Sequence, residues 1–352
     1  MGAGGNTGAA LRRTLAKRGA LVLAALVVAG LVVLALRSLD LRKVGHALIT
    51  ATPEWIVLAL VLMGVSLLMR SLSWDRVLHA ALPETHIRWP PVMRATMIGV
   101  MASAVFPGRI GEPTRVLVLS RRLEGPTRLQ LPVVAGTVVS QTLINILALL
   151  MLLAVTFTGV PLFNGHLAGF AGALAVPLVV CLLVLVGPRL LARARLSSSA
   201  RIERAANEVA RLLVLARQGL AVFAQPRYGV SAVGSQLIAW GLQWLACYAV
   251  MLALGLQSHG GIVAAAAILL AVNISAILPA TPSNVGVFQA ACVVVLAAYG
   301  VGAGAGVAYG IILQAVEVTT ALLLGVPALL GEGLTWGDIR PHVSSSADEG
   351  SE

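Results

Sequence analysis

The sequence has 352 residues, of which 58% are hydrophobic and only 11% are charged. A soluble domain carries about 25% charged residues, so this composition excludes a soluble globular protein and predicts an all-α polytopic membrane protein. The net charge of +11 would favour nucleic acid as a partner in a soluble protein. Here the arginines lie between apolar runs, which is typical of cytoplasmic loops, so no nucleic-acid partner is expected.

The apolar runs predict the membrane segments in chain order. Residues 1–19 hold four Lys and Arg residues, which place the N-terminus in the cytoplasm. The apolar run after them lacks a small-residue cleavage site and ends in Arg37, so it is expected to be a retained span rather than a signal peptide. Six full transmembrane helices are expected, at residues 20–36, 54–69, 131–157, 167–186, 228–254 and 307–330.

Two further apolar regions are interrupted by proline and glycine, and their halves are too short to span a bilayer. The region 92–120 is broken at Pro107-Gly-Arg-Ile-Gly-Glu-Pro113 and is followed by a basic loop, so a re-entrant hairpin from the cytoplasmic side is expected. The region 262–299 is broken between Pro279 and Gly286, and uncharged loops flank it, so it is expected to enter from outside. Broken backbone at membrane depth needs protein or a wet cavity around it, so this second break is expected to line a site.

The loop charges agree with an N-in, C-in topology of about eight membrane segments. The span at 54–69 is expected to end in a basic stretch from Arg70, with Trp74 at the membrane interface. The order span, hairpin, span occurs at 54–157 and again, in the opposite orientation, at 229–330, which is the pattern of an inverted-repeat transporter. Residues 331–352 are expected to form a disordered cytoplasmic tail.

Between the fourth and fifth spans lies a strongly basic segment. Residues 188–228 carry eight arginines, and apolar residues recur along one face of the predicted helix. This pattern is typical of an amphipathic helix that binds anionic lipids on the inner membrane surface. A solvated linker helix is the alternative.

The first hairpin carries three of the charges that matter most. Arg109, Glu112 and Arg115 follow one another at three-residue intervals, so neighbours can pair on one helix face. A charged residue inside a membrane is costly and usually functional, and arginine offers a planar fork that fits phosphate. The functional hypothesis is lipid-phosphate binding, and the alternative is an internal ion pair that holds the hairpin together.

Glu317 is the other candidate, near the middle of the last span. Gly310, Gln314 and Thr320 share its helix face, so the face is polar and is expected to point inward. Glu317 is expected to pair with Arg109 across the midplane, where a lipid phosphate that competes for Arg109 would release it. A protonated Glu317 bonded to a neighbouring carbonyl is the alternative.

Other polar residues in the spans are expected to join helices by hydrogen bonds. They are Gln141 with Asn145, and Gln236 with Gln243. Cys181, Cys247 and Cys292 lie in apolar runs without paired spacing and are expected to be small buried hydrophobic residues. The sequence shows no pattern of an enzyme site, so no catalytic residue, cofactor or metal is expected.

Two motifs resemble those of the lysylphosphatidylglycerol synthase transmembrane family, a flippase-like group. The first is Pro107-Gly-Arg-Ile-Gly-Glu112 with Arg115, followed by a basic loop. The second runs from Asn273 through Leu278-Pro-Ala-Thr-Pro-Ser-Asn-Val-Gly-Val-Phe-Gln-Ala290. This chain has Ser283-Asn284 where the family usually has Gly-Gly, and Gln289 where it usually has Glu. The resemblance covers residues 20–330 and does not include the family's aminoacyl-transferase domain, so no synthesis of lysylphosphatidylglycerol is expected.

The resemblance implies a protein of the bacterial inner membrane that binds and translocates a lipid with a charged or glycosylated headgroup. The expected ligand is a phospholipid or a polyprenyl-phosphate lipid, and a second copy of the chain or an envelope-synthesis protein is the expected protein partner. The alternatives are a lipid-binding subunit of an envelope glycosyltransferase complex that moves no lipid and a membrane-embedded transferase acting on a polyprenyl-phosphate. The expected headgroup-binding residues are Arg109, Glu112, Arg115, Asn273, Pro279, Pro282, Ser283, Asn284, Gly286, Gln289 and Glu317.

Overall fold

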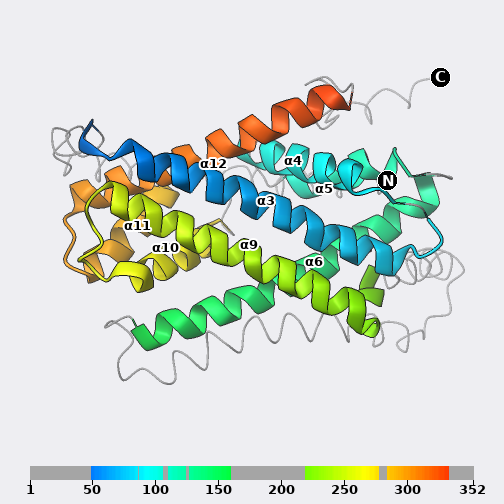
Figure 1. Ribbon diagram of the computed structural model, residues 1–352, viewed down its shortest axis with the longest axis horizontal. Coiled ribbons are helices and arrows are strands. Elements are labelled where there is room, and N and C mark those ends of the chain that lie inside the picture. Colours follow the sequence, from blue (N-terminus) through cyan, green and yellow to red (C-terminus); the bar gives the residue numbers. More distant parts are fainter. Residues whose placement is uncertain are drawn as a thin grey trace, which may run out of the picture.

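The computed structural model describes residues 49–85, 87–105, 110–123, 127–159, 219–276 and 284–332, which form a bundle of helices (Figure 1). Several expectations fall outside these residues: the spans at 20–36 and 167–186, the amphipathic segment up to residue 218, and the tail after residue 332. The same holds for the site residues Arg109, Pro279, Pro282 and Ser283.

Four helices of the described part are long and apolar enough to cross a membrane. They are α3 (Pro53–Ala81), α6 (Thr127–Gly159), α9 (Pro226–Ala253) and α12 (Ala303–Gly331). Shorter helices form two pairs, α4 (Trp89–Val105) with α5 (Gly111–Ser120), and α10 (Gly261–Ser275) with α11 (Val287–Ala298). The expected all-α membrane fold is therefore confirmed, and four of the six expected full spans are present as long helices.

The α4–α5 pair is a hairpin whose two outer ends meet at one place. Arg94 near the start of α4 and Arg122 just after α5 both bind the carboxylate of Glu332, with N–O distances of 3.1 and 2.6 Å. Where the two helices cross, a Cβ on Gly99 would lie 2.8 Å from the carbonyl oxygen of Gly111. Only glycine allows this close backbone approach, so the sequence fixes where α4 and α5 touch.

The α10–α11 pair also meets at its outer ends. A Cβ on Gly260, directly before α10, would collide with the ring of Tyr299, directly after α11. Gly260 has φ of +84°, a conformation that favours glycine. The start of α10 and the end of α11 therefore lie side by side, as they must in a hairpin.

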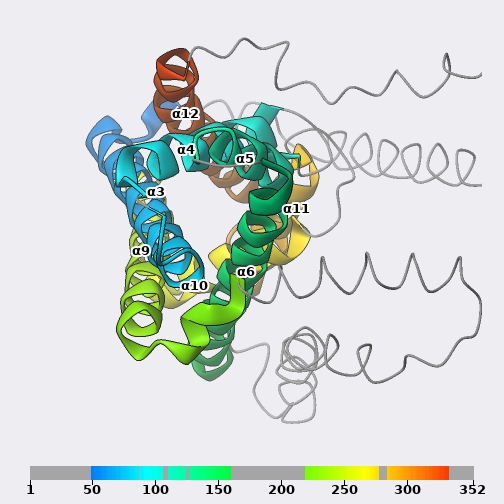
Figure 2. The same ribbon diagram turned by 90° about the vertical axis from the view of Figure 1, so that its right-hand side faces the viewer.

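Packing between helices repeats itself in the two halves of the bundle. The helix α4 packs on α12, and its counterpart α10 packs on α6. Likewise α5 packs on α6, and α11 packs on α12. The first helices of the two halves, α3 and α9, pack against each other along their length (Figures 1 and 2). Each unit therefore has the order long helix, hairpin, long helix that the sequence predicts.

The helices α3 and α9 run antiparallel. The N–H of Thr52, at the start of α3, donates to the carbonyl of Ala253, at the end of α9, at 2.9 Å. Further along, the Ser73 hydroxyl donates to the Ala232 carbonyl at 2.8 Å. The corresponding first helices of the two units thus point in opposite directions.

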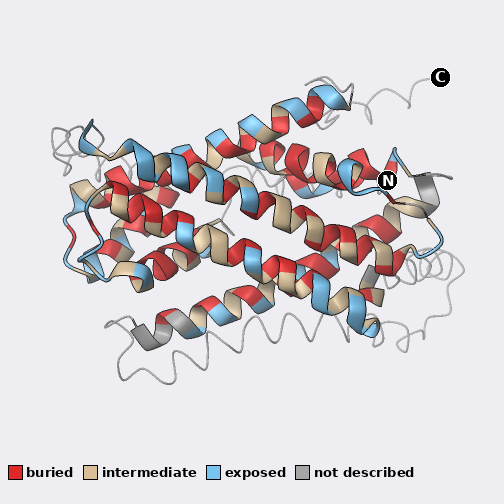
Figure 3. Ribbon diagram, in the orientation of Figure 1, coloured by how far each residue is buried: buried red, intermediate tan, exposed pale blue. Residues whose placement is uncertain are grey.

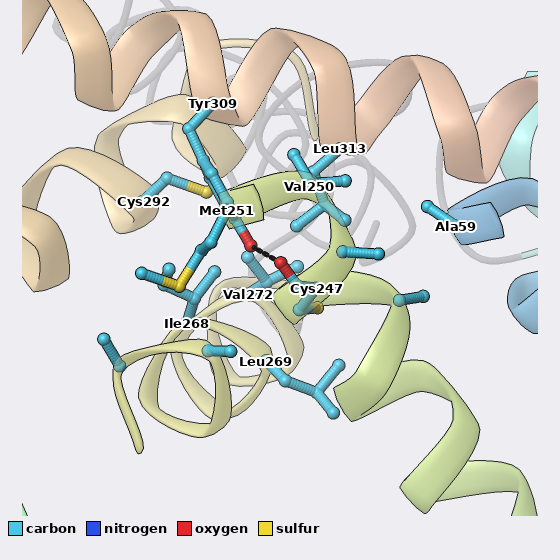
Figure 4. Packing of buried hydrophobic residues seen from close by; sticks show 14 of the residues in the cluster. Ala59, Cys247, Val250, Met251, Ile268, Leu269, Val272, Cys292, Tyr309 and Leu313 are labelled. Carbon is cyan, nitrogen blue, oxygen red and sulfur yellow. Dashed lines mark hydrogen bonds between the residues drawn. The ribbon is translucent and has the colours of Figure 1, made fainter. Parts of the chain in front are cut away.

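The core of the bundle is apolar, and buried residues line the inner faces of the helices (Figure 3). Tyr309 of α12 is fully buried, and its hydroxyl donates to the Cys247 carbonyl of α9 at 2.8 Å (Figure 4). Cys247 and Cys292 are buried and free, as expected of small hydrophobic residues. Many exposed side chains are apolar, such as Val57, Val230 and Leu323, which suits contact with lipid.

Two expected boundaries are wrong. The helix α3 continues twelve residues beyond the expected end at residue 69, to Ala81, and Trp74 is fully buried rather than interfacial. The helix ends there because the residue before proline avoids the helical conformation, and Leu82 precedes Pro83. Residues 219–224 form a short 3-10 helix, η2 (Gly219–Ala224), and not the end of one long amphipathic helix.

The contact of Glu332 with Arg94 and Arg122 should contribute measurably to stability. The Glu332 side chain is only 3% exposed, whereas the arginines are 38% and 50% exposed. We expect Glu332→Gln to lower the free energy of unfolding by about 1–2 kcal/mol, because hydrogen bonds to a charged group weaken while the arginines regain water. Unfolding in detergent measures the change. Glu84→Gln, at an exposed loop residue, is the matched control and should be neutral. Equal effects of the two variants would contradict a role for Glu332 in holding the hairpin.

Candidate functional site

Charged side chains from three helices lie near one another in the bundle. The helix α3 contributes Arg70, α5 contributes Glu112 and Arg115, and α12 contributes Glu317. Each of these residues interacts electrostatically with at least one other member of the group. We call these four residues the charge cluster.

Arg115 is the most tightly held member of the cluster. It is 6% exposed, and its Nη1 donates to Oε1 of Gln141 at 2.7 Å. Its Nη2 forms an ion pair with Glu112, one helical turn away. Its guanidinium lies over the ring of Trp74, with Cζ 4.7 Å from the ring centroid. Nε of Arg115 is buried and has no acceptor, but the other groups of the guanidinium are engaged.

Gln141 of α6 connects α5 to α3. While its Oε1 accepts from Arg115, its Nε2 donates to the backbone carbonyl of Arg70 at 3.1 Å. One turn away on both helices, Nε1 of Trp74 donates to the hydroxyl of Thr137 at 3.0 Å. These two interhelical bonds fix the position of α6 along α3. The position of Arg115 therefore depends on three helices.

Arg70 itself is held only through its backbone. Its side chain is half-buried, and among the described residues no hydrogen bond or ion pair binds its guanidinium. Glu112 and Glu317 act on it through space. The Glu112 carboxylate is paired with Arg115 and 51% exposed.

Glu317 lies on the face of α12 that is turned towards α3. One turn further on, Thr320 is buried, and its methyl group would lie 4.0 Å from a Cβ on Gly64 of α3. The Glu317 carboxylate is half-buried and, within the described ranges, makes neither a hydrogen bond nor an ion pair. Its electrostatic partner there is Arg70. The expected pairing with Arg109 involves a residue outside those ranges and stays a prediction.

In the α10–α11 pair, uncharged side chains make contacts that correspond to those of the charged side chains in the α4–α5 pair. Gln289 accepts a hydrogen bond from the backbone N–H of Gly286 at 2.7 Å and donates to Gln314 of α12 at 2.6 Å. Asn284 and Gly286 have φ of +52° and +89°, so the chain turns sharply before α11. Asn273 donates to the Leu269 carbonyl of its own helix. Gln289 thus caps α11 and joins it to α12, as Arg115 joins α5 to α6.

The remaining polar residues form bonds between long helices. Oδ1 of Asn145 on α6 accepts from Nε2 of Gln236 and Nε1 of Trp240 on α9, both at 2.7 Å. Gln243 of α9 donates to the hydroxyl of Ser66 on α3 at 3.3 Å. These residues therefore lie in the interfaces between helices.

An open apolar pocket of about 520 Å³ lies between α6, η2 and α9, and none of the charge cluster lines it. Its walls are aliphatic and aromatic, including Ile144, Phe223 and Leu237. Within the described residues, no group of three His, Cys, Asp or Glu side chains is placed to hold a metal ion.

Sequence analysis missed two residues of this site. It placed Arg70 and Trp74 at the cytoplasmic end of a span, whereas both lie inside α3 and contact the cluster or its supports. A signal was available, because no proline or glycine occurs between Met69 and Leu82, and nothing ends the helix before Pro83. The four-residue spacing of Arg70 and Trp74 also puts them on one helix face.

A comparison with known families agrees with this architecture. The family described as the lysylphosphatidylglycerol synthase TM region matches residues 21–325, which is most of the chain. No curated protein matches the sequence. With its long apolar helices and this match, the chain is a multi-pass membrane protein that belongs to the lysylphosphatidylglycerol synthase transmembrane family.

Proposed function

We propose that this protein binds a lipid with a charged or glycosylated headgroup and translocates it across the membrane. The observation that carries the proposal is the charge cluster, in which two arginines and two glutamates from three helices of an apolar bundle interact with one another. Charges inside a membrane are costly and mark substrate pathways. A polar headgroup would use this cluster while the acyl chains remain in the bilayer.

The repeated packing supports a transport role. Two units with antiparallel first helices, each with a hairpin, are the arrangement of inverted-repeat transporters, in which the substrate site lies where the repeats meet. We infer that both hairpins are re-entrant, that the termini are cytoplasmic, and that the protein resides in the bacterial inner membrane. The repeated order of helices in the two units supports the assignment of the two hairpins, and the loop charges support the orientation of the termini.

A lipid-binding subunit that moves no lipid is the second candidate. The bonds from Arg115 through Gln141 to Arg70, and from Trp74 to Thr137, tie α3, α5 and α6 together, which would suit a fixed binding site. In this case the protein would present lipid to a glycosyltransferase of the envelope. Neither candidate requires catalysis by this chain, and lipid recovered from it should be chemically unmodified.

Reconstitution separates the two candidates. We expect purified protein in phosphatidylcholine liposomes to move fluorescent phosphatidylglycerol between leaflets, which an impermeant reductant that quenches only outer-leaflet label would report. Protein-free liposomes and liposomes with an unrelated helical membrane protein are the controls. Flipping at the control rate, together with phosphatidylglycerol in the lipid that co-purifies, would support the subunit and exclude translocation.

A further inference from the structure

The two arginines of the charge cluster are held in different ways. Arg115 has an ion pair, a hydrogen bond and an aromatic ring as partners. The Arg70 side chain has no bonded partner in the part of the chain that the structure describes. Both Nη atoms of Arg115 already bind a partner and only its buried Nε lacks an acceptor, whereas a ligand at Arg70 has no bonded partner to displace there.

Arg70 nevertheless lies in the same place as the held arginine. Its carbonyl shares Gln141 with Arg115, and Trp74, one turn later on α3, carries the stacked Arg115 guanidinium. Residues four apart share a helix face, so the Arg70 side chain leaves α3 on the face that Arg115 covers. The two positive charges act on each other through space.

The carboxylates of the cluster are divided unequally. Glu112 belongs to the ion pair with Arg115. Both carboxylates act on Arg70 through space, but Glu317 has neither a hydrogen bond nor an ion pair among the described residues. The cluster thus contains one bonded pair of opposite charges, Arg115 with Glu112, and, within the described ranges, one pair without a bond, Arg70 with Glu317. We call the second pair the open pair, and it lies between α3 and α12.

We propose that Arg70 binds the phosphate group of the ligand and that Glu317 competes with that phosphate for Arg70. The inference rests on the proposed function and names its chemistry as a phosphate ester. A guanidinium offers two parallel N–H donors that match phosphate oxygens. When phosphate binds Arg70, Glu317 loses its electrostatic partner, so occupancy of the site changes the interaction between α3 and α12.

Binding of phosphatidylglycerol to the purified full chain in detergent micelles tests the proposal. Arg70→Gln should weaken binding about 10- to 100-fold, since a hydrogen-bonded charge pair is lost. Arg70→Lys should also weaken it, because the planar fork is gone. Glu317→Gln should strengthen binding, because it removes the competitor. Arg122→Gln removes the same charge at the Glu332 contact and is the matched control, with affinity expected to stay unchanged.

Two further binding measurements show whether the phosphate belongs to a lipid headgroup or is free phosphate. A diglucosyl-diacylglycerol, which has the same acyl chains and no phosphate, should bind Arg70→Gln and the unsubstituted protein equally well. Inorganic phosphate should bind far more weakly than the lipid. If it binds as tightly, and if Arg70→Gln abolishes that binding, the site takes free phosphate rather than a lipid headgroup.

The outcomes for Arg70 and for translocation are distinct. If folded Arg70→Gln binds phosphatidylglycerol with full affinity, the inference about Arg70 is wrong. If the unsubstituted protein still flips the lipid in that case, the proposed function remains supported. If phosphatidylglycerol binding depends on Arg70 but the unsubstituted protein does not flip the lipid, the inference about Arg70 is supported and translocation is excluded. If Arg70→Gln does not fold, the double variant Arg70→Gln/Glu317→Gln removes both open charges, and retained binding there would equally refute the proposal.

Discussion

Gly111→Ala should destabilise the protein by at least about 3 kcal/mol. A Cβ at this position would overlap the carbonyl oxygen of Gly99 and the hydroxyl of Ser103, both on α4. Extra carbon atoms in a packed interior cost about 1–3 kcal/mol where side chains can move aside. Here one of the blocking atoms belongs to the backbone of α4, so the two helices of the hairpin must separate. Since Arg115 lies one turn further along α5, its contacts should loosen as well.

Gly241→Ala is the matched control for this experiment. Gly241 lies inside α9, and a Cβ there would meet no atom within 4 Å. Alanine favours a helix over glycine by up to about 1 kcal/mol, so this variant should be neutral or slightly more stable. Unfolding by SDS in mixed micelles compares the two. A Gly111→Ala protein as stable as Gly241→Ala would mean that α4 and α5 do not cross at Gly99 and Gly111.

The two helix pairs were predictable because their signals are local. Proline and glycine at residues 107–113 and 279–286 interrupt the apolar runs, and the lengths on either side are too short for a span. The ends of α4, α5, α10 and α11 accordingly lie within a few residues of the expected ones. Chain breaks and segment lengths can be recognised in a sequence without knowing which helices pack against each other.

The cluster was only partly predictable because its members are brought together by tertiary packing. Charge alone identified Glu112, Arg115 and Glu317, but a basic stretch after an apolar run is also typical of a cytoplasmic loop. Arg70 was therefore assigned to the wrong place. Its environment depends on how α6 and α12 pack against α3, and on Gln141, whose sequence context is that of any polar residue in a span.

An internal repeat was also present in the sequence and was missed. Pro107-Gly-Arg-Ile-Gly111 and Pro282-Ser-Asn-Val-Gly286 share the pattern proline, two variable residues, a β-branched residue and glycine. The glycine opens α5 in one case and precedes α11 in the other. Five residues are too few to stand out in a sequence rich in glycine, and only the matching place in the two hairpins makes the correspondence visible.

Arg115 and Gln141 should depend on each other for stability. Gln141→Leu removes the acceptor of a buried charged donor and the donor to the Arg70 carbonyl, so we expect a loss of about 1–3 kcal/mol. Arg115→Met removes the charge itself and leaves Glu112, which can regain water because it is half-exposed. In the double variant the buried charge no longer needs its acceptor, so the combined loss should be smaller than the sum.

A double-mutant cycle with Arg115→Met and Gln141→Leu measures this dependence, and we expect a coupling free energy of about 1.5–3 kcal/mol. The matched cycle pairs Arg115→Met with Gln243→Leu, whose partner is Ser66 rather than a member of the cluster, and it should be additive within about 0.5 kcal/mol. Additive effects in both cycles would show that Gln141 does not hold Arg115. Because the Nη atoms of Arg115 are already bonded to Gln141 and Glu112, Arg115→Met should lower stability and weaken phosphatidylglycerol binding per folded molecule less than Arg70→Gln does. A greater loss of that binding in folded Arg115→Met than in Arg70→Gln would instead make Arg115 the main contact of the headgroup.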